Sequence, residues 1–143
     1  MEGCVITLVR SSVELEAAFD LMRELRPDLE GLTYFIEQVN RQVSVGYRLY
    51  GLWNANKIIG LVGIRISENL LYGRHLYVDD LVIDSTTRGL GYGSMLLNKA
   101  REEAASANCR NVVLDTGIQK KLAQKFYLRE GMIVKGVHFV QHL

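Results

Sequence analysis

The 143-residue sequence predicts one α/β domain, spanning residues 1–143, with a mixed, mostly antiparallel central sheet and helices on both faces. Three observations support this fold class. β-rich runs joined by short turns follow one another in the middle of the chain, as in antiparallel hairpins. A single strand–helix–strand segment comes after them, and such a crossover joins parallel strands. No internal repeat, low-complexity segment or linker divides the chain.

The first third of the chain predicts one strand and two helices. Residues 4–9 alternate and are rich in β-formers, which favours a strand. Ser11 is a suitable N-cap for the first helix, and the acidic residues that follow suit a helix N-terminus. Pro27, the only proline, ends this helix, so residues 26–33 form a turn before the second helix. The apolar positions follow helical spacing in both helices: Val13, Ala17, Leu21 and Leu25, then Leu32, Phe35, Ile36 and Val39.

The middle of the chain predicts three strands. Residues 47–53 and 58–66 form a hairpin through a turn at residues 54–57, and residues 75–83 form the third strand. Gly63 lies inside the second of these strands, as does Gly60. A glycine inside a strand indicates a bulge or a close approach of another group.

The last third predicts helices and short strands in alternation. A helix at residues 94–107 leads to a buried strand at residues 111–115. A final helix ends at Gly131, a suitable C′ glycine. Residues 132–134 and 137–140 are predicted to form two last short strands.

Composition excludes several classes of partner. The formal net charge is +1, from 17 basic and 16 acidic residues, so electrostatics predicts neither nucleic acid nor an anionic membrane as the main partner. The two cysteines, Cys4 and Cys109, lie far apart and match no metal-ligand spacing, so we expect reduced thiols and no metal. No signal peptide or membrane-spanning stretch is recognisable, which predicts a cytoplasmic protein.

Three glycines follow an arginine between the strand at residues 75–83 and the next helix. Gly89, Gly91 and Gly93 leave the backbone amides of this loop open to a ligand. Amides at a helix start lack intrahelical acceptors, and the helix dipole favours an anion there. Arg88 adds a charge with paired donors, so the pattern predicts a phosphate or pyrophosphate site.

The loop has three other interpretations. The glycines could serve only a tight turn. A dinucleotide site would use Asp115 for the ribose, but the spacing is Gly-x-Gly-x-Gly and only one crossover is present. A Walker A loop is excluded because Ser94 and Met95 follow the last glycine, where a lysine is required.

The loop resembles the pyrophosphate-binding signature of the GNAT superfamily of N-acetyltransferases, Gln/Arg-x-x-Gly-x-Gly/Ala. Arg88, Gly91 and Gly93 occupy its required positions. Residues 76–84 resemble the family's fourth strand, and residues 122–132 resemble its downstream Ala-x-x-Phe-Tyr-x-x-x-Gly-Phe segment. The resemblance covers the whole chain and implies a GNAT-like acyl-CoA N-acyltransferase fold.

The resemblance implies acetyl-CoA as the co-substrate and assigns residues to it. Backbone groups of Leu81, Val82 and Ile83 would contact the pantetheine arm. Lys120 stands where the family often has an asparagine, and would direct charge toward the 3′-phosphate. The pyrophosphate would be held by the loop and the helix start: Arg88, Gly89, Leu90, Gly91, Tyr92, Gly93 and Ser94.

The implied reaction is direct attack of a primary amine on the thioester in a ternary complex. The amide of Val82 or Ile83 would stabilise the oxyanion. By resemblance Tyr127 lies near the sulfur and acts as general acid, although it could simply pack beside Phe126.

The protonated amine also needs a base. Asp79 and Asp80 are the candidates, and strand alternation turns only one of them to the cleft unless a bulge intervenes. His75 and Tyr77 are weaker candidates for this role.

The sequence does not identify the amine acceptor. Residues 26–33 and the final strands would build its site, where Asp28 and Glu30 would suit a cationic amine, from a small molecule or a peptide. A homodimer agrees with the resemblance. The alternative functions are a catalytically degenerate acyl-CoA-binding module of the same fold and a dinucleotide-binding domain.

Overall fold

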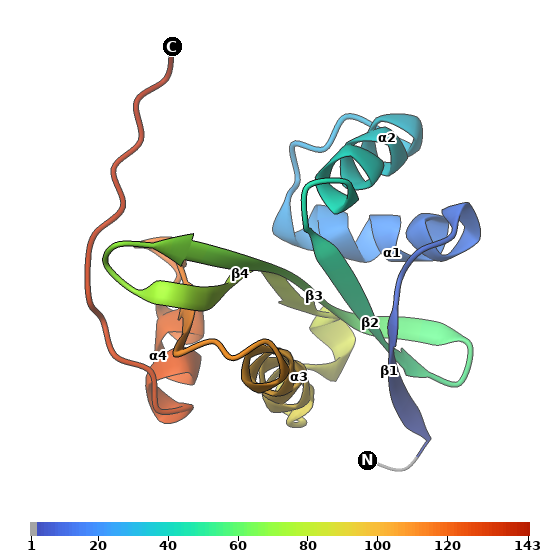
Figure 1. Ribbon diagram of the computed structural model, residues 1–143. Helices are drawn as coiled ribbons and strands as arrows, with labels where there is room; N and C mark the ends of the chain where they lie inside the picture. Colours follow the sequence, from blue (N-terminus) through green and yellow to red (C-terminus); the bar gives the residue numbers. More distant parts are fainter. Residues whose placement is uncertain (1–2) are drawn as a thin grey trace. The chain divides into compact units, whose positions relative to one another are not determined.

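The computed structural model describes residues 3–143 (Figure 1). The chain forms two compact units, Met1–Val113 and Leu114–Leu143. The chain has a five-stranded sheet in the order β1-β2-β3-β4-β5, and all of it except Leu114, the last residue of β5, belongs to the first unit. The strands are β1 Cys4–Leu8, β2 Arg48–Asn54, β3 Lys57–Asn69, β4 Gly73–Ile83 and β5 Asn111–Leu114.

The predicted fold class, a mixed and mostly antiparallel sheet, is confirmed. The first four strands pair antiparallel with their neighbours. α3, Tyr92–Ser106, connects β4 to β5, and a helical crossover of this kind joins parallel strands. α1, Ser12–Leu25, and α2, Leu32–Val43, cover one face of the sheet, whereas α3 covers the other (Figure 1).

Two apolar layers hold the first unit together. Leu15, Ala18 and Leu21 of α1 are buried and belong to a core cluster with Leu49 of β2 and Leu61 of β3. On the opposite face α3 buries its own apolar side, Leu96, Leu97, Ala100 and Ala104. Burial of this kind contributes roughly 1.5–3 kcal/mol for each large side chain, which fixes the helices against the sheet.

The start of α1 is a capping box, as Ser11 predicted. The Ser11 hydroxyl accepts a hydrogen bond from the Glu14 amide at 3.1 Å, and the Glu14 carboxylate accepts from the Ser11 amide at 2.9 Å. The Ser11 amide and the Arg10 amide, which also donates to the Glu14 carboxylate, lower the pKa of Glu14. The helix ends at Leu25, before Pro27.

β4 contains a β-bulge. Gly63 of β3 pairs with Asp80, but the next residue, Ile64, pairs with Val78. Asp79 is therefore an extra residue in β4 without a partner in the ladder. Side chains normally alternate between the faces of a strand, and the extra residue shifts this alternation by one.

Several predicted boundaries differ from the structure. The predicted strands at residues 58–66 and 75–83 are both longer in the structure, because β3 continues to Asn69 and β4 begins at Gly73, whose φ of 66° closes the turn. α3 begins at Tyr92 rather than at residue 94, since Gly91, with φ 89°, is its N-cap. Gly93 therefore lies inside the first turn of the helix.

The second unit has one helix, α4, Lys121–Arg129. The predicted C′ glycine is confirmed: Gly131 has φ 91° and follows the C-cap Glu130. The two predicted final strands, at residues 132–134 and 137–140, are wrong, because residues 132–143 form neither helix nor strand. A strand needs a neighbour for its backbone hydrogen bonds, and residues 115–143 contain no other strand.

Candidate active site

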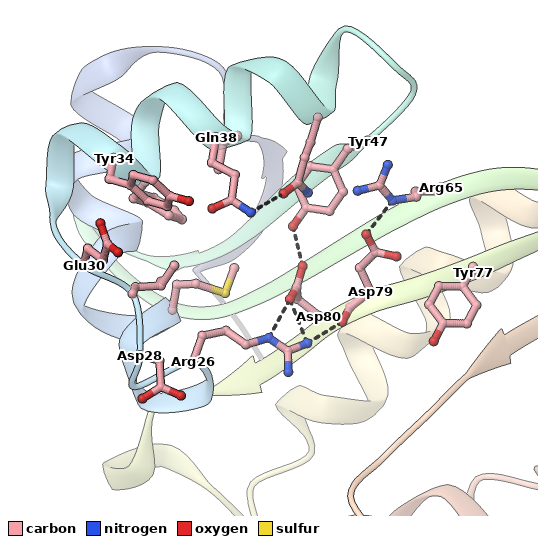
Figure 2. Close-up of a pocket in the computed structure, with 15 residues that line it drawn as sticks. Arg26, Asp28, Glu30, Tyr34, Gln38, Tyr47, Arg65, Tyr77, Asp79 and Asp80 are labelled. Carbon is pink, nitrogen blue, oxygen red and sulfur yellow. Dashed lines mark hydrogen bonds and ion pairs between the residues drawn. The ribbon is translucent and has the colours of Figure 1, made fainter. Parts of the chain in front are cut away.

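A pocket of about 540 Å³ opens in the first unit on the sheet face that carries α1 and α2 (Figure 2). Its floor comes from β3 and β4, and its walls come from α2 and from the end of α1 with the loop that follows. Its lining residues are Met22, Arg26, Asp28, Leu29, Glu30, Tyr34, Phe35, Gln38, Val39, Gln42, Tyr47, Arg65, Tyr77, Asp79 and Asp80.

Both carboxylates of β4 line this pocket, although they are adjacent in sequence. Regular alternation would have turned one of them to the α3 face, as the sequence predicted. The structure instead contains the bulge that the sequence left as the alternative, and the extra residue keeps Asp79 and Asp80 on the same face. Tyr77 lines the pocket as well.

Asp80 accepts hydrogen bonds at both of its oxygens. Oδ1 accepts from Arg26 Nε at 3.1 Å and from Arg26 Nη2 at 3.0 Å, and Oδ2 accepts from the Tyr47 hydroxyl at 2.6 Å (Figure 2). The side chain of Asp80 is only 13% exposed. Arg26, the C-cap of α1, thereby ties the α1–α2 loop to β4.

Asp79 is bound at one oxygen only. Its Oδ2 accepts from Arg65 Nε at 2.5 Å, while its backbone carbonyl accepts from Arg26 Nη2 at 2.7 Å. No donor reaches Oδ1 from anywhere in residues 3–143. Burial raises the pKa of Asp79, and the charge of Asp80 adds to the rise, whereas Arg65 opposes it.

Tyr47 is a site residue that sequence reasoning missed. It is 2% exposed, and burial, followed by the nearby Asp80, raises its pKa well above the usual range, so the hydroxyl stays a donor. Its ring lies over Gly63, where a Cβ would overlap both the hydroxyl and the ring. The signal in the sequence was Gly63, which predicted a close approach without identifying the approaching group.

The α1–α2 loop contributes two further acids, Asp28 and Glu30, to the pocket wall. Both are exposed and bind no partner among the described residues. His75 is absent from the pocket lining. It is buried, and its Nδ1 lies 2.9 Å from the carbonyl oxygen of Gly73.

The glycine loop lies between β4 and α3. Asp84 organises its start, since the carboxylate accepts from the Thr86 amide and hydroxyl, both at 2.9 Å, over the short 3-10 helix Ser85–Thr87. Gly89 and Gly91 have φ of 79° and 89°, and nothing lies within 4 Å of a Cβ built on Gly89. The open loop and the helix start therefore fit a pyrophosphate group.

Arg88 of this loop is already held by the protein. Its Nε donates to the carbonyl of Ile83 at 3.1 Å, and its Nη2 lies 4.0 Å from a Glu24 oxygen. The Arg88 side chain is 60% exposed, so it remains accessible to an anion.

The end of β4 presents backbone amides on both edges. The Asp84 amide donates to the carbonyl of Ile59 at 2.9 Å, on the β3 side. Alternation then turns the amide of Val82 toward β3 as well, and those of Leu81 and Ile83 away from it. Of the two predicted oxyanion donors, only Ile83 directs its amide away from the β3 ladder.

Tyr127 and Lys120 belong to the second unit. Lys120 is the N-cap of α4, and Tyr127 lies near the end of this helix. The rings of Phe126 and Tyr127 meet edge to face with centroids 5.2 Å apart. Burial raises the pKa of Tyr127, so its hydroxyl keeps its proton at neutral pH.

Residues 3–143 show neither a metal site nor a membrane-spanning helix. No group of three or more His, Cys, Asp or Glu side chains is arranged to hold a metal ion there. Within the same residues, no helix is both long and apolar enough to span a membrane.

Comparison with known proteins identifies the class of this fold and site. The model of the Acetyltransferase (GNAT) family matches residues 15–132. The chain therefore belongs to the GNAT acetyltransferase family, and the resemblance carried by Arg88, Gly91 and Gly93 is confirmed.

Individual relatives identify the activity. The uncharacterized N-acetyltransferase YhdJ of Bacillus subtilis is 33% identical over 117 residues, which are 82% of this chain and 82% of that protein. The aminoalkylphosphonate N-acetyltransferase of Salmonella typhimurium is 35% identical over 97 residues, which are 67% of this chain and 60% of that protein. The chain is an N-acetyltransferase.

Solved structures share the fold. AAC(6')-Iy, in complex with the bisubstrate analog CoA-S-monomethyl-acetylneamine, has a TM-score of 0.84 at 14% identity, over 98% of both chains. Glucosamine-6-phosphate N-acetyltransferase from Arabidopsis thaliana has a TM-score of 0.79 at 21% identity, over 99% of both chains.

Proposed function

We propose that the enzyme transfers an acetyl group from acetyl-CoA to a primary amine bound in the pocket beside β4. The amine attacks the thioester directly in a ternary complex. The observation that carries this proposal is the bulge in β4, which places two carboxylates of one strand in the same pocket. A pocket with this pair can both attract an ammonium group and accept its proton.

The donor site is proposed at the end of β4 and the start of α3. Leu81, Val82 and Ile83 offer backbone groups to the pantetheine arm, and the Ile83 amide is the oxyanion donor. The open glycine loop supports the pyrophosphate site, and Lys120 supplies charge for the 3′-phosphate. The residues proposed to bind the pyrophosphate are Arg88, Gly89, Leu90, Gly91, Tyr92, Gly93 and Ser94. The CoA complex of AAC(6')-Iy, which shares the fold, supports acetyl-CoA as the co-substrate.

The acid and base are proposed from chemistry. A free primary amine has a pKa of about 10.4 and is almost fully protonated at pH 7, so the Asp79–Asp80 pair removes a proton before attack. Tyr127 protonates the leaving thiolate, and its raised pKa supports a protonated hydroxyl.

The acceptor is proposed to be a small-molecule or peptide amine. Relatives named for aminoalkylphosphonate and glucosamine-6-phosphate acetylation support a small molecule. The pocket volume of about 540 Å³ also lies within the range of small-ligand sites.

The first experiment is a calorimetric titration with acetyl-CoA, with NADH as the control ligand. We expect acetyl-CoA to bind at micromolar concentration and NADH not to bind. A thiol-release assay with a panel of amines, including aminoalkylphosphonates, then identifies the acceptor. Absence of acetyl-CoA binding would falsify the proposed donor site. Binding without turnover of any amine would instead favour the degenerate acyl-CoA-binding module.

A further inference from the structure

We propose that the two adjacent carboxylates have different roles. Asp79 accepts the proton of the amine, while Asp80 is a fixed negative charge that Tyr47 and Arg26 hold in place. Tyr47 is then a positioning residue of the active site. This inference rests on the proposed function and deepens it, because it says which member of the pair acts as the base.

The hydrogen bonds of Asp80 leave it poorly placed to be the base. Both of its oxygens already accept from protein donors, two of them on the Arg26 guanidinium and one on the Tyr47 hydroxyl. These donors all bind the charged form of the carboxylate. A proton transferred to Asp80 would have to displace one of them.

Asp79 has the complementary geometry. Arg65, from β3, occupies Oδ2, and Oδ1 accepts no hydrogen bond within residues 3–143. The charged and titratable groups around it are Arg65 from β3, Arg26 from the end of α1, Asp80 from β4 and Tyr47 from the residue before β2. Burial and the charge of Asp80 both raise the pKa of Asp79, which makes it the better proton acceptor.

Tyr47 connects the two carboxylates. Its hydroxyl donates to Asp80, and the Arg65 guanidinium, which binds Asp79, stacks over its ring with Cζ 5.2 Å from the centroid. The ring can occupy this place only because Gly63 has no side chain. Gly63 is also the ladder partner of Asp80. One tyrosine, at the residue before β2, thus contacts Asp80 directly and Asp79 through Arg65.

The proton balance of the reaction is consistent with one base. The bound ammonium group loses one proton to Asp79 Oδ1, and this proton passes to water in each turnover. The amine then forms the C–N bond as the C–S bond breaks. The nitrogen releases its second proton to water, and Tyr127, which gave its proton to the thiolate, regains one from water, so that each turnover releases one net proton.

The test compares Asp79→Asn with Asp80→Asn, using acetyl-CoA binding as a readout independent of turnover. We expect Asp79→Asn to lower kcat by about 10²-fold or more, the usual range for loss of a general base, with acetyl-CoA affinity unchanged. Asp80→Asn should lower kcat less. It should also move the acidic limb of kcat/KM to lower pH, because removal of the Asp80 charge lowers the pKa of Asp79.

Tyr47→Phe tests the positioning role, since the ring and its stacking on Arg65 remain. We expect kcat to fall several-fold while KM for acetyl-CoA is unchanged. The matched control is Tyr50→Phe, another buried tyrosine, which is absent from the pocket lining.

The outcomes separate this inference from the proposed function. Loss of turnover in Asp80→Asn with turnover retained in Asp79→Asn reverses the assignment and overturns the inference. Full turnover in both variants would mean that another group is the base. This result would overturn the inference but not the proposed acetyltransferase function. A Tyr47→Phe enzyme that behaves like Tyr50→Phe overturns the positioning role. A wild-type protein that binds no acetyl-CoA overturns both proposals.

Discussion

At the scale of single residues, Tyr127 offers a direct test of the leaving-group chemistry. Tyr127→Phe removes the hydroxyl and keeps the ring that packs against Phe126. We expect kcat to fall by about 10²-fold, because the thiolate would leave without a proton donor. Acetyl-CoA affinity, measured by calorimetry, should stay close to that of the wild type.

The matched control for this variant is Tyr72→Phe, which removes a hydroxyl from the turn between β3 and β4. Equal turnover of Tyr127→Phe and wild type would exclude the general-acid role.

Gly63→Ala tests how closely Tyr47 and β3 fit. The added Cβ overlaps the Tyr47 hydroxyl and ring, so the buried tyrosine must move away from Asp80. We expect a loss of about 1–3 kcal/mol in the free energy of unfolding, typical of overpacking, and a lower kcat. Urea unfolding and steady-state kinetics measure the two effects.

A double variant makes this test specific. Tyr47→Phe removes the atom with the closest overlap, so the cost of Gly63→Ala should be smaller in the Tyr47→Phe background. Gly31→Ala is the control, because nothing lies within 4 Å of a Cβ at this position. Strict additivity of the two changes would show that Tyr47 and Gly63 do not interact.

The sequence could predict the reacting residues but not their partners. Asp79 and Asp80 were recognisable because they precede the glycine loop on one strand. Tyr47 and Arg26 lie 33 and 54 residues before Asp80, and only the folded chain brings them to it. Local patterns carry no information about contacts at such separations.

At the scale of elements, the capping box of α1 makes stability depend on pH. The pKa of Glu14 is lowered in the folded protein relative to 4.5, so its contribution is present above the unfolded value and is lost as the pH falls through the folded value. We expect Glu14→Gln to reduce the free energy of unfolding at pH 7. The difference from wild type should vanish at low pH in a series of urea titrations.

Glu16→Gln is the control on the same helix, because its carboxylate makes no hydrogen bond in the described part of the chain. A separate variant, Ser11→Ala, should cost about 1 kcal/mol through loss of the N-cap. A Glu14→Gln effect that is the same at every pH would contradict the role of its charge.

Helix ends were predictable, whereas the sequence offered the bulge only as an alternative to regular pairing, and the reason is physical. Caps depend on neighbouring residues, so Ser11, Pro27 and Gly131 mark boundaries that the structure reproduces. A bulge depends on how two strands pair, and the sequence of β4 alone does not state its register with β3. The sequence could therefore name both carboxylates but could not place both of them in one pocket.

At the scale of the whole molecule, the two units differ in how many of their residues are buried. The first contains the sheet and its core, whereas α4 of the second has no fully buried residue. Segments with few buried residues open more easily, so the backbone amides of α4 should exchange with deuterium faster than those of β3. We expect acetyl-CoA to slow exchange in α4, because Tyr127 and Lys120 are proposed to contact it.

Mass spectrometry after deuterium labelling, with and without acetyl-CoA, measures this effect. NADH is again the control ligand. Unchanged exchange in α4 under saturating acetyl-CoA would remove the second unit from the proposed donor site.

The final strands show where sequence patterns mislead. Residues 132–140 are rich in β-formers, and this favours a strand wherever a free strand edge is available. In the structure these residues form no strand, and Val134, Val137 and Phe139 are exposed. Propensity describes what a segment can form, whereas hydrogen-bond partners decide what it does form.

Because of the bulge, the proposed active site depends on the number of residues in β4 as well as on their chemistry. With one residue fewer before Asp79 and Asp80, the strand could pair regularly with β3 and would turn one carboxylate to the α3 side. Both acids would still be present in the sequence, but only one would reach the pocket. A relative with a single insertion or deletion in β4 would thus keep both aspartates in its sequence but would have only one of them in the pocket. The length of this strand is therefore itself a functional trait.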